Sequence, residues 1–219
     1  MKIISLNVGR PRLLSWKGST FSTGIFKEPV AGRVRLRQTN FDGDRQADLA
    51  VHGGPEKAGY AYPWEHYPYW TGLLSRENLV WGSFGENLTT EGLLETNVSV
   101  GDQFRIGSAT VMVRSPRTPC FKLAAKFDRD AILKEFLKSG YSGYYFSVVE
   151  EGDVGPGDEF ELVASETPTL TIAEVNRLYV SYTTDFDLMQ RATQVKSLPE
   201  GWRAHFQAKL AAAEKEARI

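Results

Sequence analysis

Short segments that favour β-strands, separated by glycines, occupy most of the chain and most strongly limit what it can fold into. Each segment is rich in β-branched residues or alternates apolar with polar residues, and turn residues bound it. They run from residue 2 to about residue 163: KIISLNVG, STGIFKEPV, GRVRLRQTN, ENLVWG, NVSVGDQFRIG, ATVMVRS, GYYFSVVEEG and GDEFELVA. Tight turns between short strands, such as those predicted at Gly101-Asp102 and Gly107-Ser108, favour a barrel or a sandwich. We expect a mainly β domain built as a barrel.

Two segments of helical character interrupt this pattern. The first spans residues 56–74, is rich in aromatic residues and contains Pro63 and Pro68. The second spans residues 122–138, and Gly140 is a typical stop for a helix at that point. The predicted fold is therefore mainly β with inserted helices.

The pattern becomes helical after Thr167-Pro168. Thr171 and Glu174 have the spacing of a capping box in front of IAEVNRLYV, and Asp185 can cap FDLMQRATQVKSL. A third helix is predicted to begin at Pro199, with one apolar stripe formed by Trp202, Phe206 and Leu210. These signals predict two domains: a β-barrel over residues 1–164 and a small three-helix unit over residues 165–219.

Charge and cysteine content narrow the classes of partner. Residues 1–60 hold ten Lys and Arg against five Asp and Glu, although the whole chain has a net charge of −1. This mild basic bias favours an anionic small molecule over a nucleic acid. A single cysteine excludes an internal disulfide and fits a reducing compartment. No secretory signal and no apolar stretch of about 18 residues is present, so we expect a cytoplasmic protein without a membrane partner.

The only cysteine, Cys120, lies in the segment SPRTPC at the entry to the second predicted helix. Backbone N–H groups and the helix dipole at such a position favour a thiolate and lower the pKa of a thiol. Arg117 and Lys122 add positive charge nearby. The alternative is that Cys120 is a small buried apolar residue. The residues alone leave both interpretations open.

Two further clusters are candidates for binding. In GDRQADLAVHGGPEK, glycines allow backbone amides to approach an anion, and the cluster contributes Arg45, His52, Gly53, Gly54 and Lys57. The alternative is an ordinary turn in front of a packed helix.

The second cluster is GSFGENL, in which Asn87 could bond the edge of a heterocycle or a phosphate. A glycine turn with a capping polar residue explains the same pattern. The phosphate loop GxxxxGK[ST], the elbow GxSxG, the zinc motif HExxH and the motif CxxC are all absent from the sequence. Their absence disfavours nucleotide hydrolysis, serine hydrolase chemistry and zinc peptidase chemistry.

Taken in order, four motifs resemble the MOSC domain, the family named for the C-terminal domain of molybdenum-cofactor sulfurases. They are GDRQADLAVHGGPEKAGYAYPWEHYPYW, WGSFGENL, VGDQFRIGSATVMVRSPRTPCFKL and SGYSGYYFSVVEEGDVGPGDEFEL. The tail from Thr169 to about Leu210 is similar to the three-helix unit of the bacterial subgroup linked to resistance against N-hydroxylaminopurine. The resemblance covers almost the whole chain.

The resemblance implies a β-barrel that binds the molybdenum cofactor, with Cys120 as the sulfur ligand of the metal. His52, Gly53, Gly54, Lys57, Arg117, Thr118 and Arg45 would form the cradle for the cofactor. The implied reaction is reduction of an N-hydroxylated compound, such as a hydroxylaminopurine or an amidoxime, to the amine. Asn87 or a nearby acid would then serve the departing oxygen.

The sequence has no flavin, haem or iron–sulfur signature, so a separate flavin reductase is expected to supply electrons. A homodimer is a further possibility, and the sequence does not decide whether the chain would dimerise through its helical tail. The alternative function is a sulfur carrier, in which Cys120 holds a persulfide for assembly of metal–sulfur clusters.

Overall fold

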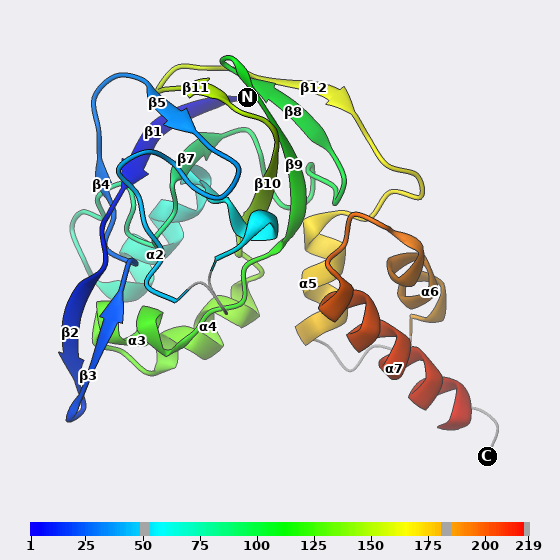
Figure 1. Cartoon of the computed structure of the whole chain (residues 1–219). Helices are drawn as coiled ribbons and strands as arrows, with labels where there is room; N and C mark the ends of the chain where they lie inside the picture. Colours follow the sequence, from blue (N-terminus) through cyan, green and yellow to red (C-terminus); the bar gives the residue numbers. More distant parts are fainter. Residues whose placement is uncertain (49–52, 181–184, 217–219) are drawn as a thin grey trace.

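The computed structural model of the protein describes residues 1–48, 53–180 and 185–216. Within these residues, one eight-stranded sheet dominates the fold, in the order β12-β8-β9-β10-β6-β7-β1-β4 (Figure 1). Its strands are β1 (Lys2–Val8), β4 (Glu28–Pro29), β6 (Gly59–Pro63), β7 (Leu88–Glu91), β8 (Gln103–Ile106), β9 (Ala109–Pro116), β10 (Tyr144–Glu150) and β12 (Phe160–Ala164). Neighbours in this order pair antiparallel except β6 and β7, which run parallel. The predicted mainly β fold with helices at its C-terminal end is confirmed.

The prediction of a closed barrel is corrected. The sheet curls so that the start of β1 approaches the start of β12, but one isolated bridge joins them, between Lys2 and Glu159. The amide of Ile3 also donates to the carbonyl of Asp158 at 2.9 Å. Further along β1, the short edge strand β4 pairs with Asn7 and Val8 instead. Because β1 and β12 meet only at their ends, no continuous ladder closes the sheet.

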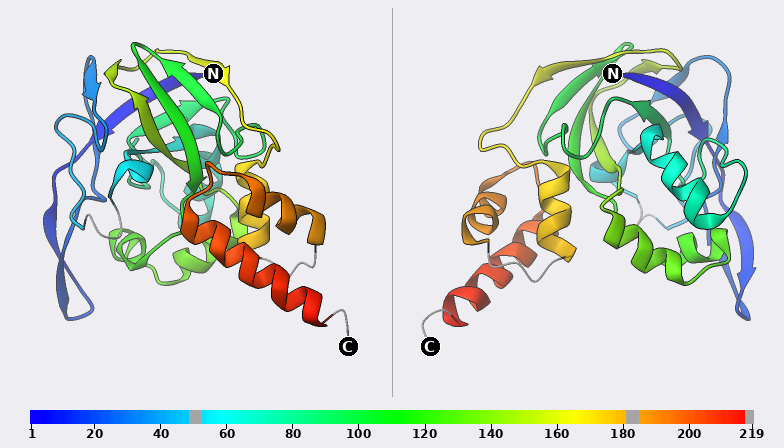
Figure 2. Two further views of the ribbon diagram at one scale, coloured as in Figure 1. Left: turned by 45° about the vertical axis from the view of Figure 1, so that its right-hand side comes forward. Right: turned by 180° about the vertical axis from the view of Figure 1, so that it is seen from behind.

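Two small antiparallel pairs accompany the large sheet. Strands β5 (Val34–Leu36) and β11 (Gly152–Val154) form one pair, and β2 (Arg12–Trp16) with β3 (Ser19–Thr23) forms a hairpin. The hairpin turns at Lys17 and Gly18, which both have positive φ. It projects from the sheet on the side away from the C-terminal helices (Figures 1 and 2).

The predicted helix over residues 56–74 is wrong in its first half. The structure has a short 3₁₀ helix η1 (Pro55–Lys57), then β6, a second 3₁₀ helix η2 (Trp64–His66), and only then α2 (Tyr67–Leu74). All five residues of β6 are buried, since β6 lies inside the sheet between β10 and β7. A strand that is covered on both faces has no apolar–polar alternation for the sequence to show.

Two other local predictions also change. The predicted strand ENLVWG is irregular. The predicted helix over residues 122–138 is divided into α3 (Phe121–Phe127) and α4 (Ala131–Ser139). The division falls at Asp128, whose backbone is left-handed, with a φ of 50°. The predicted stop at Gly140 is confirmed, because Gly140 is the C-cap of α4.

Three helices follow the sheet: α5 (Ile172–Val180), α6 (Phe186–Gln194) and α7 (Glu200–Glu216). The predicted capping box is present, since the amide of Glu174 donates to Thr171 Oγ1 at 3.1 Å and the amide of Thr171 donates to Glu174 Oε2 at 2.8 Å. Asp185 caps α6 by accepting from the amide of Leu188 at 3.0 Å. Among the described helices, none is long and apolar enough to cross a membrane.

Candidate functional site

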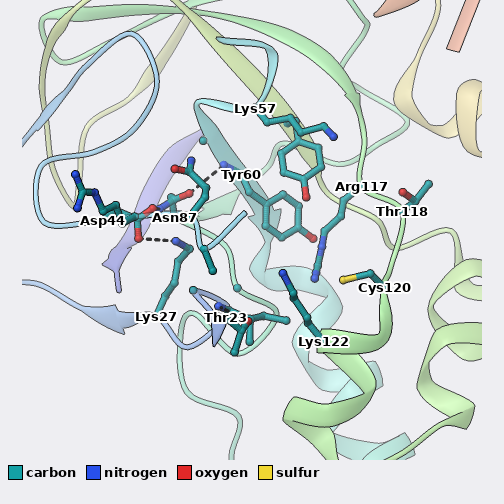
Figure 3. Close-up of a pocket in the computed structure, with 18 residues that line it drawn as sticks. Thr23, Lys27, Asp44, Lys57, Tyr60, Asn87, Arg117, Thr118, Cys120 and Lys122 are labelled. Carbon is teal, nitrogen blue, oxygen red and sulfur yellow. Dashed lines mark hydrogen bonds and ion pairs between the residues drawn. The ribbon is translucent and has the colours of Figure 1, made fainter. Parts of the chain in front are cut away.

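A pocket lies where β6 and the end of β9 approach the start of α3, and its cavity measures about 90 Å³ (Figure 3). The lining residues come from segments far apart in the sequence, namely residues 23–27, 44–47, 57–60, 85–87, 117–122 and Tyr145. The predicted residues Arg45, Lys57, Asn87, Arg117, Thr118 and Cys120 all line this pocket. The fold therefore brings together residues from all three candidate clusters of the sequence.

Two predicted residues, Gly53 and Gly54, do not line the pocket. Gly53 and Gly54 lie immediately before η1, and Gly54 has a left-handed φ of 93°. A substituted Cβ at Gly54 would meet no heavy atom within 4 Å, so its backbone conformation rather than crowding favours glycine there. His52 lies outside the described residues.

Cys120 is the N-cap residue of α3 and has extended backbone, with φ −126° and ψ 171°. Its side chain is half-buried. Figure 3 shows the sulfur facing the pocket beside the side chain of Arg117. The prediction that Cys120 occupies a helix entry is confirmed, and a fully buried structural role does not fit this position.

Arg117 places a buried cation at the centre of the site. It is 6% exposed, donates through Nη1 to the carbonyl of Phe84 at 2.6 Å, and lies 5.0 Å from the ring centroid of Tyr60. Among the described residues, no carboxylate forms an ion pair with Arg117 or with Lys122, which is 9% exposed. Buried charges are normally paired. Two cations that the described carboxylates leave without an ion pair favour an anionic ligand in this pocket.

Lys27 and Asp44 form a buried ion pair on the opposite wall, with 2.5 Å between Nζ and Oδ1. Burial lowers the pKa of Lys27, and the Asp44 carboxylate opposes that shift. Asp44 also accepts from the amide of Gly9 at 2.8 Å and from Asn87 Nδ2 at 3.0 Å. The Asp44 carboxylate therefore accepts hydrogen bonds from three segments of the chain and holds them together.

Asn87 is a structural centre of the same wall. Its Nδ2 donates to Asp44 and to the carbonyl of Asn7 at 3.2 Å, and its Oδ1 accepts from the amide of Tyr60 at 3.2 Å. Both amide hydrogens are thus used within the protein, so the geometry favours a supporting role for Asn87. The predicted catalytic role of Asn87 stays a prediction.

The segment GSFGENL wraps around the buried carboxylate of Glu86. Glu86 accepts from the amides of Gly82 and Phe84, at 2.8 and 3.0 Å, and from Thr89 Oγ1 at 3.1 Å. Lys126 of α3 completes the packing by donating to the carbonyls of Gly82 and Ile25, at 2.8 and 3.0 Å. Burial lowers the pKa of Lys126 to about 7, although Glu86 opposes the shift. This loop is a scaffold beneath the pocket.

Sequence reasoning missed several lining residues. Lys27 and Asp44 are 17 residues apart, and no local pattern connects a lysine in a strand-like segment with an aspartate in a loop. For Lys122, the sequence indicates only positive charge near Cys120. Tyr145 lies on β10 opposite Tyr60, and its alternation within a strand predicts nothing beyond packing. A lysine that directly follows the apolar pair Ile25-Phe26 is the one signal in the sequence for a buried Lys27.

Comparison with known families gives two matches. Residues 48–161 match the MOSC domain, and residues 170–213 match the YiiM-like, 3-alpha helix domain. The first match runs from before β6 to the start of β12 and includes the pocket residues from Lys57 to Tyr145. The second covers the three C-terminal helices.

Similar proteins span nearly the whole chain. The uncharacterized protein YflK of Bacillus subtilis (strain 168) is 44% identical over 207 residues, covering 94% of this chain and 93% of that protein. A crystal structure of YiiM from Geobacillus stearothermophilus has a TM-score of 0.79 and 34% identity, covering 95% of this chain and 98% of that chain.

A third relative is longer. A protein of Gibberella moniliformis (strain M3125 / FGSC 7600) named Reductase is 30% identical over 181 residues, which are 81% of this chain but 32% of that protein. Together, the two matched domains, the relatives and the shared fold establish that this chain belongs to the MOSC domain family and carries a YiiM-like 3-alpha helix domain after it.

Proposed function

We propose that this protein binds the molybdenum cofactor and reduces N-hydroxylated compounds, such as hydroxylaminopurines and amidoximes, with electrons from a separate flavin reductase. The observation that carries the proposal is a pocket in which the Cys120 thiol lies beside Arg117 and Lys122 (Figure 3). Membership of the MOSC family supports the cofactor, and the relative named Reductase supports the class of reaction.

The residues of the pocket fit the proposed cofactor. A thiolate is a soft ligand that suits a metal held by sulfur, and Cys120 supplies it. The anionic phosphate end needs charged and hydroxyl donors, which Arg45, Lys57, Thr118 and Lys122 present on the same lining. Arg117, held by Phe84 and Tyr60, would keep positive charge beside the thiolate without moving. When bound, the cofactor would supply the two electrons that cleave the N–O bond.

The residues of the chain that line the pocket would position the substrate. Tyr60 and Tyr145 lie with ring centroids 5.3 Å apart, and both line the pocket. Aromatic walls of this kind hold a planar base by stacking. We therefore assign Tyr60 and Tyr145 to substrate orientation.

The decisive experiment measures molybdenum and pterin in protein expressed in a host that makes the cofactor. We expect stoichiometric molybdenum and pterin in the native protein. Cys120→Ser should lose molybdenum and reductase activity by at least about 100-fold, since the sequence has no other cysteine and a serine hydroxyl is a harder ligand than a thiolate. The free energy of unfolding should change by less than about 0.5 kcal/mol, because the half-buried side chain is not a core filler.

A pair of lysine variants tests whether positive charge in the pocket holds the cofactor. Lys122→Met should weaken pterin retention, whereas Lys134→Met, on the exposed face of α4, should leave retention unchanged. Full activity and metal content in Cys120→Ser would contradict the ligand role. A persulfide on Cys120 without molybdenum, seen by mass spectrometry of the native protein, would support the sulfur-carrier alternative instead.

A further inference from the structure

The turn of residues 140–143, between α4 and β10, lies between the pocket and the three-helix unit. On the pocket side, the Tyr60 hydroxyl donates to the carbonyl of Ser142 at 2.7 Å. On the other side, Asn176 of α5 donates through Nδ2 to Ser142 Oγ at 2.7 Å and to the carbonyl of Gly140 at 3.3 Å. Ser142 is thus bonded both to a residue that lines the pocket and to a residue of the C-terminal helices.

The turn fits tightly against Tyr60. A Cβ added at Gly143 would lie 2.3 Å from the carbonyl oxygen of Ala61 and 2.9 Å from the Tyr60 ring, and its φ of 57° is left-handed. The amide of Gly143 donates to Glu95 Oε1 at 2.7 Å. Because the turn at Gly143 is already in close contact with the Tyr60 ring, we expect a shift of the turn to displace Tyr60.

Tyr60 in turn supports the cation beside the sulfur. Its ring lies 5.0 Å from the Arg117 guanidinium, which has one backbone acceptor, the carbonyl of Phe84, and no ion pair among the described residues. Figure 3 shows Arg117 between Tyr60 and Cys120. The position of the charge next to Cys120 therefore depends on where Tyr60 is held.

From these contacts we infer that Asn176 is a positioning residue of the pocket, through which the three-helix unit sets Tyr60 and Arg117 beside Cys120. The inference rests on the proposed function only in taking this pocket as the site, and it does not require molybdenum. It gives the C-terminal helices a role in the site although none of them lines the pocket.

We expect Asn176→Ala to keep the fold. Asn176, Gly140 and Glu95 line a second cavity of about 410 Å³ on the far side of the turn. Because Asn176 borders this space, water can replace the lost amide in Asn176→Ala. The expected effect is a local shift of the turn and not unfolding.

The experiment uses the fact that Cys120 is the only thiol. Rates of alkylation are measured with anionic iodoacetate and neutral iodoacetamide at one pH, on the protein without cofactor. Both reagents react with the thiolate, so the ratio of the two rates does not depend on the thiolate fraction. The ratio rises with the positive charge beside the sulfur, because only iodoacetate is an anion. Asn176→Ala, Ser142→Ala and Tyr60→Phe should each lower this ratio by about twofold. The double variant Asn176→Ala/Tyr60→Phe should lower it no further than Tyr60→Phe alone, since the two residues act in series.

Arg191→Leu is the matched control. It removes the 2.5 Å pair between Arg191 and Glu174 within the same three-helix unit, and Arg191 has no hydrogen bond to the turn among the described residues. The ratio should stay at the native value, and circular dichroism should show that all variants are folded. An unchanged ratio in both Asn176→Ala and Ser142→Ala would overturn the inference, as would additive effects in the double variant. Because no cofactor is needed, a failure of the proposed function would appear separately, as absent molybdenum and pterin.

Discussion

At the scale of single residues, the site contains several buried cations, only some of which are paired with a carboxylate of the described residues. Lys27 is compensated by Asp44, whereas Arg117 and Lys122 form no ion pair with the described carboxylates. Lys126 donates only to carbonyl oxygens in the hydrogen bonds found for it. A pocket with this surplus of positive charge is adapted to an anion, and the same surplus makes the protein's stability depend on pH.

Lys126 allows that dependence to be tested. Its pKa is lowered from 10.5 to about 7 in the folded protein, so between these values the unfolded chain holds a proton that the folded chain has released. Stability must then rise with pH in this window, and below about pH 7 the contribution is constant. Relative to Lys126→Met, the native free energy of unfolding should increase by up to about 1.4 kcal/mol per pH unit between about pH 7.5 and about pH 9.5.

Urea denaturation at a series of pH values measures this difference. Lys134→Met, which alters an exposed lysine, should give a difference from the native protein that does not change with pH. A flat difference for Lys126→Met would show that Lys126 keeps its proton in the folded protein.

At the scale of elements, α5 is joined to the sheet domain by backbone bonds. The amide of Val100 donates to the carbonyl of Leu170 at 2.8 Å, and the amide of Ile172 donates to the carbonyl of Val98 at 2.9 Å. The capping box at Thr171 begins α5 immediately at this junction. The start of α5 is therefore fixed both by its own cap and by the loop in front of β8.

Removal of the cap tests how far α5 depends on it. Thr171→Ala deletes the hydroxyl that accepts from the amide of Glu174, and the free energy of unfolding should fall by about 1 kcal/mol. Thr193→Ala removes an exposed hydroxyl in the last turn of α6 and should change stability by less than about 0.5 kcal/mol. Thermal unfolding measures both, and equal effects would argue against the cap.

At the scale of the whole molecule, one apolar core runs from the sheet into the helices. Val98, Val100, Leu170, Ile172 and Val175 belong to the same buried cluster. Figure 2 shows the helices against one end of the sheet in both views. Two family domains in sequence thus share one hydrophobic core in the structure.

A truncated chain ending at residue 164 should therefore fold poorly. It would expose residues that the helices cover, such as Val98 and Val100 in the loop in front of β8, which are fully buried in the intact protein. We expect a marked loss of soluble yield and strong binding of an apolar dye compared with the full chain. A soluble, cooperatively unfolding truncated chain would show that the sheet domain is stable by itself.

The local features of this protein could be predicted from its sequence. Helix caps and the stop at Gly140 depend on residues within a few positions of one another, and these predictions are confirmed. The predicted strand segments each contain a strand, except ENLVWG, which is irregular. The position of Cys120 at a helix entry was also readable, because Pro119 and the residues that follow set it locally. The order of the four motifs also predicted the family, because it resembles that of the MOSC domain.

Only the tertiary structure decided which residues meet and how the sheet ends. The strand β6 could not be predicted from its own segment, which has helical character. Its burial comes from β7 and β10, which are distant in the sequence. Likewise, the pairing of Lys27 with Asp44 and the link from Asn176 through Ser142 to Tyr60 join residues 17 to 82 positions apart. The physical reason is that burial and charge compensation are properties of neighbours in space, whereas caps and turns are properties of neighbours in the chain.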